Sequence, residues 1–221
     1  MNDKLPLVIA NLKANKTWDE VSAWLDTVAQ YAENFQGTVI FCPSHPFISQ
    51  ASEKINANGL RIKLSLQDIS RFEQGQYTGE VAASQVADLC KYTIIGHSER
   101  RQNFKESDEM LSQKVQNATE AGITPIFCIQ SEQTSIPKNV TVVAYEPVEA
   151  IGTGHPDTPE DARKVAHLAK SQGSYTIIYG WSVSADNVKS FITRDLIDGV
   201  LVATNSLDPQ NFIKILNSIT S

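Results

Sequence analysis

The sequence predicts an α/β protein that forms a closed (β/α)8 barrel. Short apolar, β-branched runs alternate with segments of helical periodicity along the chain of 221 residues, without a linker or a change in composition. Most of these runs are apolar at successive positions, as in the strands of a parallel sheet that is covered on both faces. Eight such units favour one barrel domain over residues 1–221.

An open, doubly wound sheet is the alternative fold for this alternation. That fold usually carries a glycine-rich turn after its first strand. Here the first turn reads NLKANK, over residues 11–16, and contains no glycine. The closed barrel is therefore favoured.

The predicted strands are rich in valine, isoleucine and leucine, and they are bounded by polar or turn-forming residues. In a closed parallel barrel their carboxyl ends would meet at one rim. In chain order they are Leu5–Asn11, Thr38–Pro43, Arg61–Gln67, Tyr92–Gly96, Ile123–Ile129, Val140–Glu146, Tyr175–Gly180 and Gly199–Ala203.

Signals for helix starts lie between the predicted strands. Thr17 and Glu20 form a capping box ahead of an apolar stripe with helical spacing. Ser107 is placed to cap another amphipathic segment, and Thr158 and Asp208 are each followed by a proline at its favoured first helical position. The connection between the fifth and sixth strands, IQSEQTSIPKN, is too short and polar for a full helix, so we expect the fifth helix to be vestigial.

Composition and charge exclude several classes of protein. Apolar residues make up 41% and charged residues 20% of the chain, as in folded globular proteins, and a formal charge of −6 argues against a general nucleic-acid binder. We expect no membrane span and no signal peptide, because the first apolar run is short and ends at Asn11. Cys42, Cys90 and Cys128 are far apart and odd in number, which indicates reduced thiols in a cytoplasmic protein.

Candidate catalytic residues follow the ends of the predicted strands, where the active sites of such barrels lie. Lys13 follows the first strand, His97 follows the fourth, and Glu146 ends the sixth. Each of these residues alone is more often an ordinary loop residue or a structural histidine. An amine, an imidazole and a carboxylate on one rim favour general acid–base chemistry on a small polar molecule.

Other chemistries lack their sequence signals. Cys42 and His45 lie close together, but no second pair of ligands has the spacing of a metal site. The chain contains neither a nucleotide-binding glycine loop nor the G-x-S-x-G turn of serine hydrolases. We therefore expect no metal and no cofactor.

Five segments resemble the triosephosphate isomerase family, in the order in which that family has them. They are NLKAN after the first strand, GQYTGEV (Gly75–Val81), YTIIGHSERR (Tyr92–Arg101), AYEPVEAIGTG (Ala144–Gly154) and DGVLVATNSL (Asp198–Leu207). The third and fourth segments are highly specific, and together the five span nearly the whole chain. The resemblance implies a TIM barrel that interconverts dihydroxyacetone phosphate and D-glyceraldehyde 3-phosphate in glycolysis and gluconeogenesis, without a cofactor.

The resemblance also implies roles for the rim residues. Glu146 would remove a proton from one substrate carbon and return it to the neighbouring carbon, while His97 would polarise the substrate oxygens. The family is itself a standard example of such a carboxylate base beside a neutral histidine. Lys13 would supply fixed positive charge beside the developing oxyanion. Asn11 would help to hold the substrate, and Glu99 would pair with Lys13.

A phosphate site is implied on backbone N–H groups of a lid and of the last two loops. The lid would follow Pro147 and carry its tip at residues 151–154, where it would exclude water from the reaction. The positions that match the family's phosphate contacts are Gly152, Ser182, Ala203 and Thr204.

The connection Asp68–Glu80 is long for a barrel of this kind. In the family its counterpart projects into a second subunit, where the residue that matches Thr78 supports the lysine pocket. The resemblance therefore implies a homodimer or a homotetramer, with a phosphorylated triose as the small-molecule partner and no nucleic-acid or membrane partner. Phe72 and Tyr77 favour burial of this connection against another surface.

The chain departs from the family pattern at four places. Glu149 replaces the usual tryptophan of the lid hinge, Trp181 replaces a glycine, Ala203 and Thr204 replace two glycines near the phosphate, and CIQSE replaces CIGE. The glutamate and the shortened fifth connection resemble archaeal members, which form tetramers. Two other hypotheses stay open, namely a non-catalytic phosphosugar-binding or scaffolding barrel derived from an isomerase, and a barrel enzyme for a different sugar phosphate.

Overall fold

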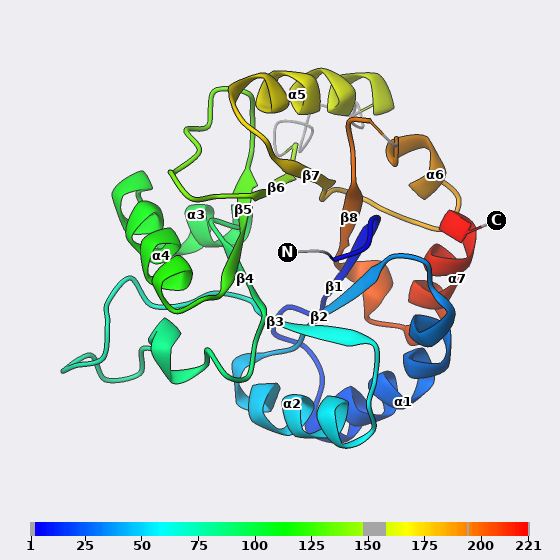
Figure 1. The fold of residues 1–221 in the computed structure, drawn as a ribbon, viewed down its shortest axis with the longest axis horizontal. Helices are drawn as coiled ribbons and strands as arrows, with labels where there is room; N and C mark the ends of the chain where they lie inside the picture. The colour runs from blue at the N-terminus through cyan, green and yellow to red at the C-terminus, as the bar shows by residue number, and fades with distance from the viewer. Residues whose placement is uncertain (1–2, 148–157, 194, 221) are drawn as a thin grey trace.

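The computed structural model describes residues 3–147, 158–193 and 195–220 (Figure 1). Within them, eight parallel strands form a closed barrel in which each strand pairs with the next and β8 pairs with β1, so the predicted fold class is confirmed. The strands are β1 (Leu7–Asn11), β2 (Thr38–Cys42), β3 (Ile62–Leu66), β4 (Tyr92–Ile95), β5 (Thr124–Ile129), β6 (Val142–Tyr145), β7 (Thr176–Tyr179) and β8 (Gly199–Val202).

Helices form a ring outside the strands, as the view along the barrel shows (Figure 1). The α-helices are α1 (Trp18–Asn34), α2 (Ile48–Ala57), α3 (Ser98–Phe104), α4 (Asp108–Glu120), α5 (Pro159–Gln172), α6 (Val188–Phe191) and α7 (Pro209–Thr220). Short 3-10 helices are η1 (His45–Phe47), η2 (Ala83–Gln85) and η4 (Thr204–Ser206). No helix among the described residues has both the length and the apolar character needed to cross a membrane.

The strands lie where the apolar runs predict them, and the differences fall at their ends. The first strand begins at Leu7 and not at Leu5, whose side chain is half exposed. Leu7 is the first residue to join the ladder, with its N–H donating to the carbonyl of Asp198 at 3.0 Å. Pro6 has no N–H to donate, so the ladder cannot extend back through it.

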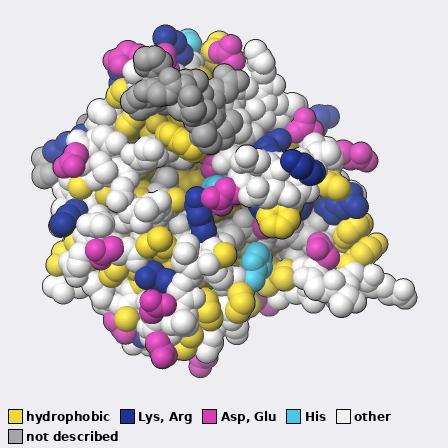
Figure 2. Space-filling model, turned by 180° about the vertical axis from the view of Figure 1, so that it is seen from behind, with side chains coloured by type: hydrophobic (Ala, Val, Ile, Leu, Met, Phe, Trp, Pro, Cys, Tyr) yellow, Lys and Arg dark blue, Asp and Glu magenta, His cyan; other side chains and the backbone are white. Residues whose placement is uncertain are grey.

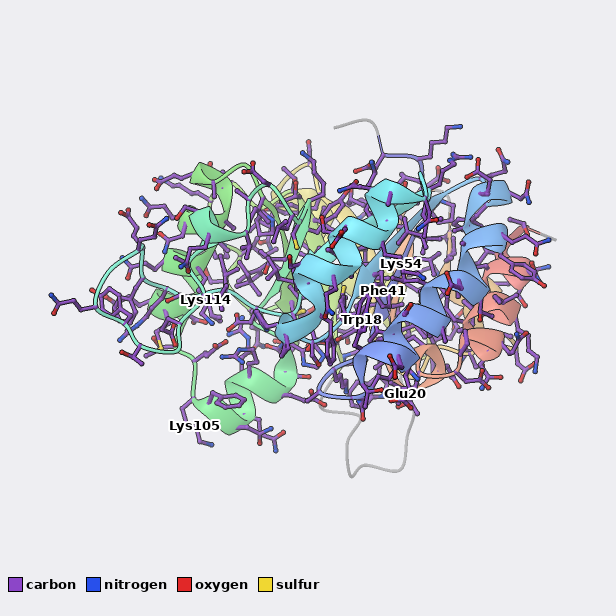
Figure 3. All side chains as sticks on the ribbon, turned by 90° about the horizontal axis from the view of Figure 1, so that it is seen from below. Trp18, Glu20, Phe41, Lys54, Lys105 and Lys114 are labelled. Atoms are coloured by element: carbon purple, nitrogen blue, oxygen red, sulfur yellow. The ribbon has the colours of Figure 1, made fainter. Side chains whose placement is uncertain are left out.

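The predicted helix starts are confirmed by side-chain hydrogen bonds. The carboxylate of Glu20, labelled in Figure 3, accepts the N–H of Thr17 at 2.7 Å. Ser107 and Thr158 each accept a backbone N–H from three residues further along, at 3.3 and 3.2 Å. Asp208 accepts the N–H of Gln210 at 2.9 Å. These bonds satisfy N–H groups that have no partner inside the helix.

Two connections depart from strict strand–helix alternation. Residues 130–141, between β5 and β6, form no helix, which confirms the expected loss of the fifth helix. The connection between β3 and β4 contains no α-helix and only η2, so the predicted alternation of strands and helices is incomplete there as well. In η2 the N–H groups of Gln85 and Val86 bond to carbonyls three residues back, which makes one tight turn in place of a longer helix.

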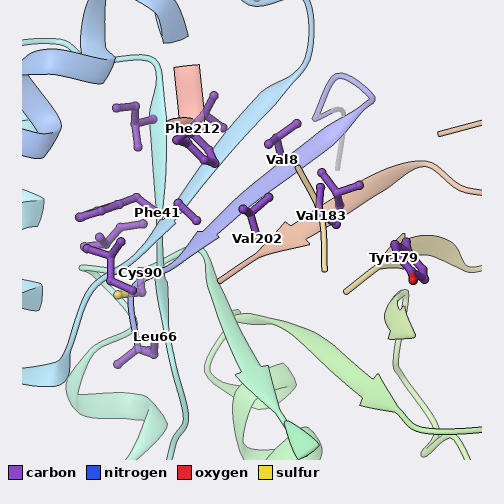
Figure 4. Close-up of a cluster of buried hydrophobic side chains, with 14 of the residues drawn as sticks. Val8, Phe41, Leu66, Cys90, Tyr179, Val183, Val202 and Phe212 are labelled. Atoms are coloured by element: carbon purple, nitrogen blue, oxygen red, sulfur yellow. The ribbon is translucent and has the colours of Figure 1, made fainter. Parts of the chain in front are cut away.

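The core has two layers that follow the alternation of side chains along each strand. On β1, Leu7 and Ile9 point into the barrel, whereas Val8 and Ala10 face the helices. Figure 4 shows part of the outer layer, with Val8, Phe41 and Phe212 among its labelled residues. The inner layer consists of Leu7, Ile9, Ile40, Cys42, Tyr92, Ile94, Ile126, Cys128, Val142, Ala144, Ile178 and Leu201.

Trp24 of α1 anchors the outer layer. Its ring stacks on Phe41 with centroids 4.5 Å apart and lies 5.3 Å from the ring of Phe212. Its indole N–H donates to the carbonyl of Ser206 at 2.7 Å, so the polar end of this buried side chain is satisfied. Helix α1 is thereby fixed to the loop that follows β8.

Barrel closure needs a glycine at the start of β8. Gly199 lies opposite Leu7 in the register between β8 and β1. A Cβ atom on Gly199 would come within 2.1 Å of the Leu7 carbonyl oxygen. Any side chain there would force the first and last strands apart.

The cysteines are free thiols within the fold. Cys42, Cys90 and Cys128 are all buried. Burial raises the pKa of Cys42 and of Cys90 to about 12, and it also raises the pKa of Cys128. All three are therefore protonated, unreactive members of the core near neutral pH.

Candidate active site

A cavity of about 820 Å³ opens at the carboxyl ends of the strands. On this side of the molecule a cationic, an acidic and a histidine side chain lie close together near the middle of the face (Figure 2). The described residues that line the cavity include Lys13, His97, Ser98, Glu99, Arg101, Gln102, Gln130, Glu146, Gly180, Trp181, Ser182, Val183, Leu201, Ala203, Thr204 and Asn205. The structure thus brings together the amine, the imidazole and the carboxylate that the sequence places at three strand ends.

Glu146 directly follows β6, and its side chain is almost fully buried. One carboxylate oxygen, Oε2, accepts the N–H of Ser98 at 2.8 Å, and the other, Oε1, lies 3.0 Å from Nε2 of His97. Burial raises the pKa of Glu146 above its ordinary value, and the neighbouring His97 and Ser98 N–H oppose that rise. A carboxyl group with a raised pKa is a stronger base when it is ionised.

The hydrogen bonds of His97 define its tautomer. Its Nδ1 accepts the backbone N–H of Glu99 at 3.2 Å, so Nδ1 carries no proton. The proton of a neutral ring must then be on Nε2, which faces Glu146 at 3.0 Å. The carboxylate of Glu99 is 3.8 Å from Nδ1, too far to change this assignment. His97 can therefore donate a hydrogen bond from Nε2 into the cavity.

Helix α3 explains the position of His97. The ring belongs to the residue just before the helix, and the N–H groups of Arg100 and Arg101 bond to the His97 carbonyl at 2.8 and 3.1 Å. The positive end of the helix dipole therefore lies beside the ring.

Lys13 projects its amine into the cavity from an unusual backbone conformation. Its φ is 52°, in the left-handed region that favours glycine. Its N–H is accepted by Asn11 Oδ1 at 3.0 Å, and its carbonyl accepts from Ser44 and Gln67, each at 2.9 Å. The Nζ atom lies 2.6 Å from Glu99 Oε1. Surrounding side chains thus hold a strained backbone in place, an arrangement common at functional sites.

The positions assigned to phosphate binding lie together where they are described. Ser182, Ala203 and Thr204 line one side of the cavity, after β7 and β8. Ser182 is also left-handed, with a φ of 46°. Gly152 lies outside the described residues, as do Glu149 and the rest of the lid from residue 148 to 157.

Two assigned residues do not line the described cavity. Asn11 is buried, and its side-chain Oδ1 accepts the backbone N–H of Lys13, as described above. Thr78 is exposed in the long connection after β3. In that connection Phe72 and Tyr77 stack on each other at 3.9 Å, and Tyr77 remains 44% exposed. The expected burial of these two rings against another surface is not found within one chain.

Sequence reasoning missed several polar residues of the cavity, among them Gln130 and Asn205. Nε2 of Gln130 lies 3.5 Å from Glu146 Oε2 and 3.4 Å from the Gly96 carbonyl. Asn205 donates from Nδ2 to the Val183 carbonyl at 2.6 Å. Gln130 lies in the segment CIQSE and Asn205 in the segment ATNSL, and both segments depart from the family pattern. That departure was the available signal, but the contacts of the two side chains depend on how separate loops pack together.

Among the described residues no group of three or more histidine, cysteine, aspartate or glutamate side chains could hold a metal ion. The buried carboxylate of Glu146 is instead engaged by Ser98 and His97.

A (β/α)8 barrel with a buried carboxylate, a histidine and a lysine at its carboxyl rim has the architecture of a barrel enzyme. The family description "Triosephosphate isomerase" matches residues 6–219. The chain is similar to triosephosphate isomerases from Aquifex aeolicus, at 34% identity over 96% of this chain and 98% of the relative, and from Mesomycoplasma hyorhinis, at 36% over 95% and 97%. A third, from Hahella chejuensis, is 32% identical over 96% and 97%. The chain belongs to the triosephosphate isomerase family, and it is an isomerase.

Proposed function

We propose that the protein interconverts dihydroxyacetone phosphate and D-glyceraldehyde 3-phosphate through an enediol(ate), with Glu146 as the base. The observation that carries this proposal is the meeting of Glu146, His97 and Lys13 in one cavity. The membership of the family supports the choice of substrate.

The side chains of the site account for each proton transfer. The Glu146 carboxylate takes a proton from a substrate carbon, and the electrons of that C–H bond form the C=C bond of the enediolate. The Nε2–H of His97 donates to the substrate oxygens, and the Lys13 ammonium stabilises the negative charge that develops there. Glu146 then returns the proton to the neighbouring carbon, while the hydroxyl proton of the substrate passes to the former carbonyl oxygen through Nε2 of His97. The atoms and electrons balance without an oxidant or reductant.

Glu146 must change its contacts for this reaction. Its two oxygens are now occupied by the Ser98 N–H and by His97 Nε2. A substrate would receive the His97 donor and leave Glu146 free to face the reacting carbons. The substrate therefore competes with Glu146 for His97.

Phosphate binding is assigned to backbone N–H groups at Ser182, Ala203 and Thr204, with Gly152 from the family match. The support for the first three is their position on the same side of the cavity. Ala203 and Thr204 keep their N–H groups although they replace glycines, so donation to phosphate depends on their backbone dihedrals and not on their side chains.

We also propose a homodimer or homotetramer in which Thr78 of one copy supports the Lys13 region of another, and a cytoplasmic location. Support for assembly comes from the long β3–β4 connection, whose Tyr77 is partly exposed. The free, buried cysteines fit a reducing compartment. Sedimentation of the purified protein measures the assembly.

The direct test is an assay of the purified protein with glyceraldehyde 3-phosphate, in which dihydroxyacetone phosphate is followed. Glu146→Gln should lower kcat by about 10²–10⁴-fold, the usual contribution of a positioned base. Glu132→Gln is the matched control, because Glu132 is exposed in the β5–β6 connection. Equal turnover by Glu146→Gln and wild type would remove Glu146 from this role.

A non-catalytic phosphosugar-binding or scaffolding barrel is the second candidate. The observation that favours it is the presence of Trp181 and Thr204 side chains where the family has glycines, in the cavity itself. This candidate requires phosphosugar binding without turnover. A different sugar phosphate as substrate would show as preferred turnover in a competition assay.

A further inference from the structure

Asn205 joins the two loops that follow β7 and β8. It lies in η4, and its Nδ2 donates to the carbonyl of Val183 at 2.6 Å across 22 positions of sequence. Both residues line the cavity. The bond therefore crosses the gap between the loops that carry Ser182 and Thr204.

Hydrogen bonds of the buried residue Ser206 also hold the loop after β8. Ser206 is fully buried, and its hydroxyl donates to the Ala203 carbonyl at 2.6 Å. The Ser206 carbonyl accepts the indole N–H of Trp24 at 2.7 Å. Asn205 thus belongs to a segment that a hydrogen bond attaches to α1.

A second asparagine holds the loop after β7 from its other side. Asn187 donates from Nδ2 to the Ser182 carbonyl at 2.9 Å and accepts the Ser184 N–H through Oδ1 at 2.8 Å. Together, Asn187 and Asn205 hold the carbonyls of the consecutive residues Ser182 and Val183. These two peptide planes carry the N–H groups of Val183 and Ser184, so holding them fixes the backbone directly after the Ser182 N–H.

We propose that Asn205 is a positioning residue that joins the loops after β7 and β8 into one rigid anion cradle. This inference rests on the proposed function, because it takes the N–H groups at Ser182 and Thr204 as phosphate donors. Donors that are already oriented bind an anion without the cost of ordering two loops. The left-handed φ of Ser182 makes such support more important, since this conformation is unfavourable for serine.

Loss of the bond should weaken phosphate binding without removing the donors. Asn205→Ala is expected to raise the dissociation constant for inorganic phosphate roughly two- to tenfold, as for one net hydrogen bond. Asn205→Asp nearly preserves the shape but cannot donate to Val183, and it adds negative charge to the cavity lining. It is expected to bind phosphate more weakly than Asn205→Ala.

Calorimetric titration of the purified, full-length variants with inorganic phosphate tests this inference. Asn58→Ala is the matched control, because Asn58 also donates from Nδ2 to a backbone carbonyl, that of Lys54 at 2.8 Å, outside the cavity. Support requires weaker binding by both Asn205 variants and wild-type affinity in Asn58→Ala. Unchanged affinity in Asn205→Ala, or an equal loss in the control, would overturn the proposal.

Enzyme kinetics distinguish a positioning role of Asn205 from a general loss of fold stability in the Asn205→Ala variant. In the isomerase assay Asn205→Ala should raise KM by the same factor as the phosphate constant, with a smaller change in kcat. A lowered thermal midpoint with unchanged phosphate affinity would overturn the positioning role. If wild type binds phosphate but does not isomerise, the proposed function fails while the titration still decides the role of Asn205. If wild type binds no phosphate, the inference itself is wrong.

Discussion

The Oε1 atom of Glu146 lies 3.0 Å from Nε2 of His97, so the two groups assigned to base and electrophile contact each other directly. Because Nδ1 of His97 accepts the Glu99 N–H, Nε2 is the ring nitrogen with a proton to give. In this arrangement the donor that the substrate needs is occupied by the base. Under the proposed function, substrate binding must separate them, so the reaction would begin with a displacement of Glu146.

The pH dependence of kcat/KM should reflect the buried environment of Glu146. Burial raises its pKa, and only the ionised carboxylate can accept a proton. Activity should therefore be lost as pH falls through a midpoint above the ordinary glutamate value of 4.5. A pH profile of kcat/KM measures this midpoint, and a midpoint at or below the ordinary value would contradict the expectation.

Gln130 should influence that same midpoint. Its amide donates toward Glu146 Oε2 at 3.5 Å, which stabilises the ionised form and lowers the pKa of Glu146. Gln130→Leu removes this donor while keeping a side chain of similar size, so the acidic limb of kcat/KM should move to higher pH. The shift should be small, because a contact of 3.5 Å is weak.

Ser131→Ala is the control for Gln130→Leu. Ser131 is the next residue along the chain and does not line the cavity. Its acidic limb should coincide with that of wild type. Identical limbs for wild type and both variants would show that Gln130 has no effect on the base.

Substitution of Lys13 should distinguish the backbone strain at this residue from the contribution of its ammonium group to activity. Lys13 has a φ of 52°, which glycine adopts freely and alanine does not. Lys13→Gly should be more stable than Lys13→Ala by about 1 kcal/mol, the lower end of the cost of a left-handed non-glycine residue. Both variants should lose most activity, because neither has the ammonium group.

Urea unfolding of the two Lys13 variants measures this difference. Lys16 is the control position, because it also has positive φ, at 74°, and does not line the cavity. Lys16→Gly and Lys16→Ala should differ in stability in the same direction but keep their activity. A Lys13→Ala protein as stable as Lys13→Gly would show that no strain is stored there.

Four charged side chains form a buried network beside the β3–β4 connection. Lys114, labelled in Figure 3, lies 2.6 Å from both Asp68 and Glu106, and Arg100 lies 2.9 Å from Asp68 and 2.8 Å from Glu106. Lys114→Met leaves two carboxylates with one cation and should destabilise the fold by about 3–5 kcal/mol. Equilibrium urea unfolding measures the loss.

A second substitution tests the cause of that loss. Lys114→Met combined with Asp68→Asn should be less destabilised than the sum of the single variants, because no excess carboxylate remains. Burial raises the pKa of Asp68 and Lys114 opposes that rise, so in Lys114→Met the folded protein takes up a proton on Asp68 at higher pH than wild type does. The stability cost of Lys114→Met should therefore shrink as pH falls. Strict additivity at all pH values would argue against a charge effect.

The strands and most helix starts could be predicted because their causes are local. Apolar runs mark each strand, and Thr17, Ser107 and Thr158 provide hydrogen-bond acceptors within three residues of the N–H groups they cap. The missing helix after β3 could not be predicted as surely. The segment from Val81 to Lys91 has an apolar pattern that suits either a helix or the tight turns that form.

The site shows the same division between local and distant causes. The rim positions of Lys13, His97 and Glu146 follow from strand ends alone. The left-handed backbone of Lys13 does not, because Ser44 and Gln67 reach it from 31 and 54 positions away. Asn205 likewise meets Val183 only after the loops pack, and a sequence pattern contains no such distance information.

The connection of residues 130–141 shows that the strands of this barrel can pair without a helix covering every connection. Cys128 and Ile129 still pair with Ala144 and Tyr145 although no helix joins their strands. A closed ring of strands has no open edge to protect, so one external segment can be dispensed with. Lys138 and Asn139 are exposed in this connection, whereas Ile136 packs against the core, so the bond between Lys138 and Asn139 is a suitable place to insert a foreign module such as a binding peptide or a tether.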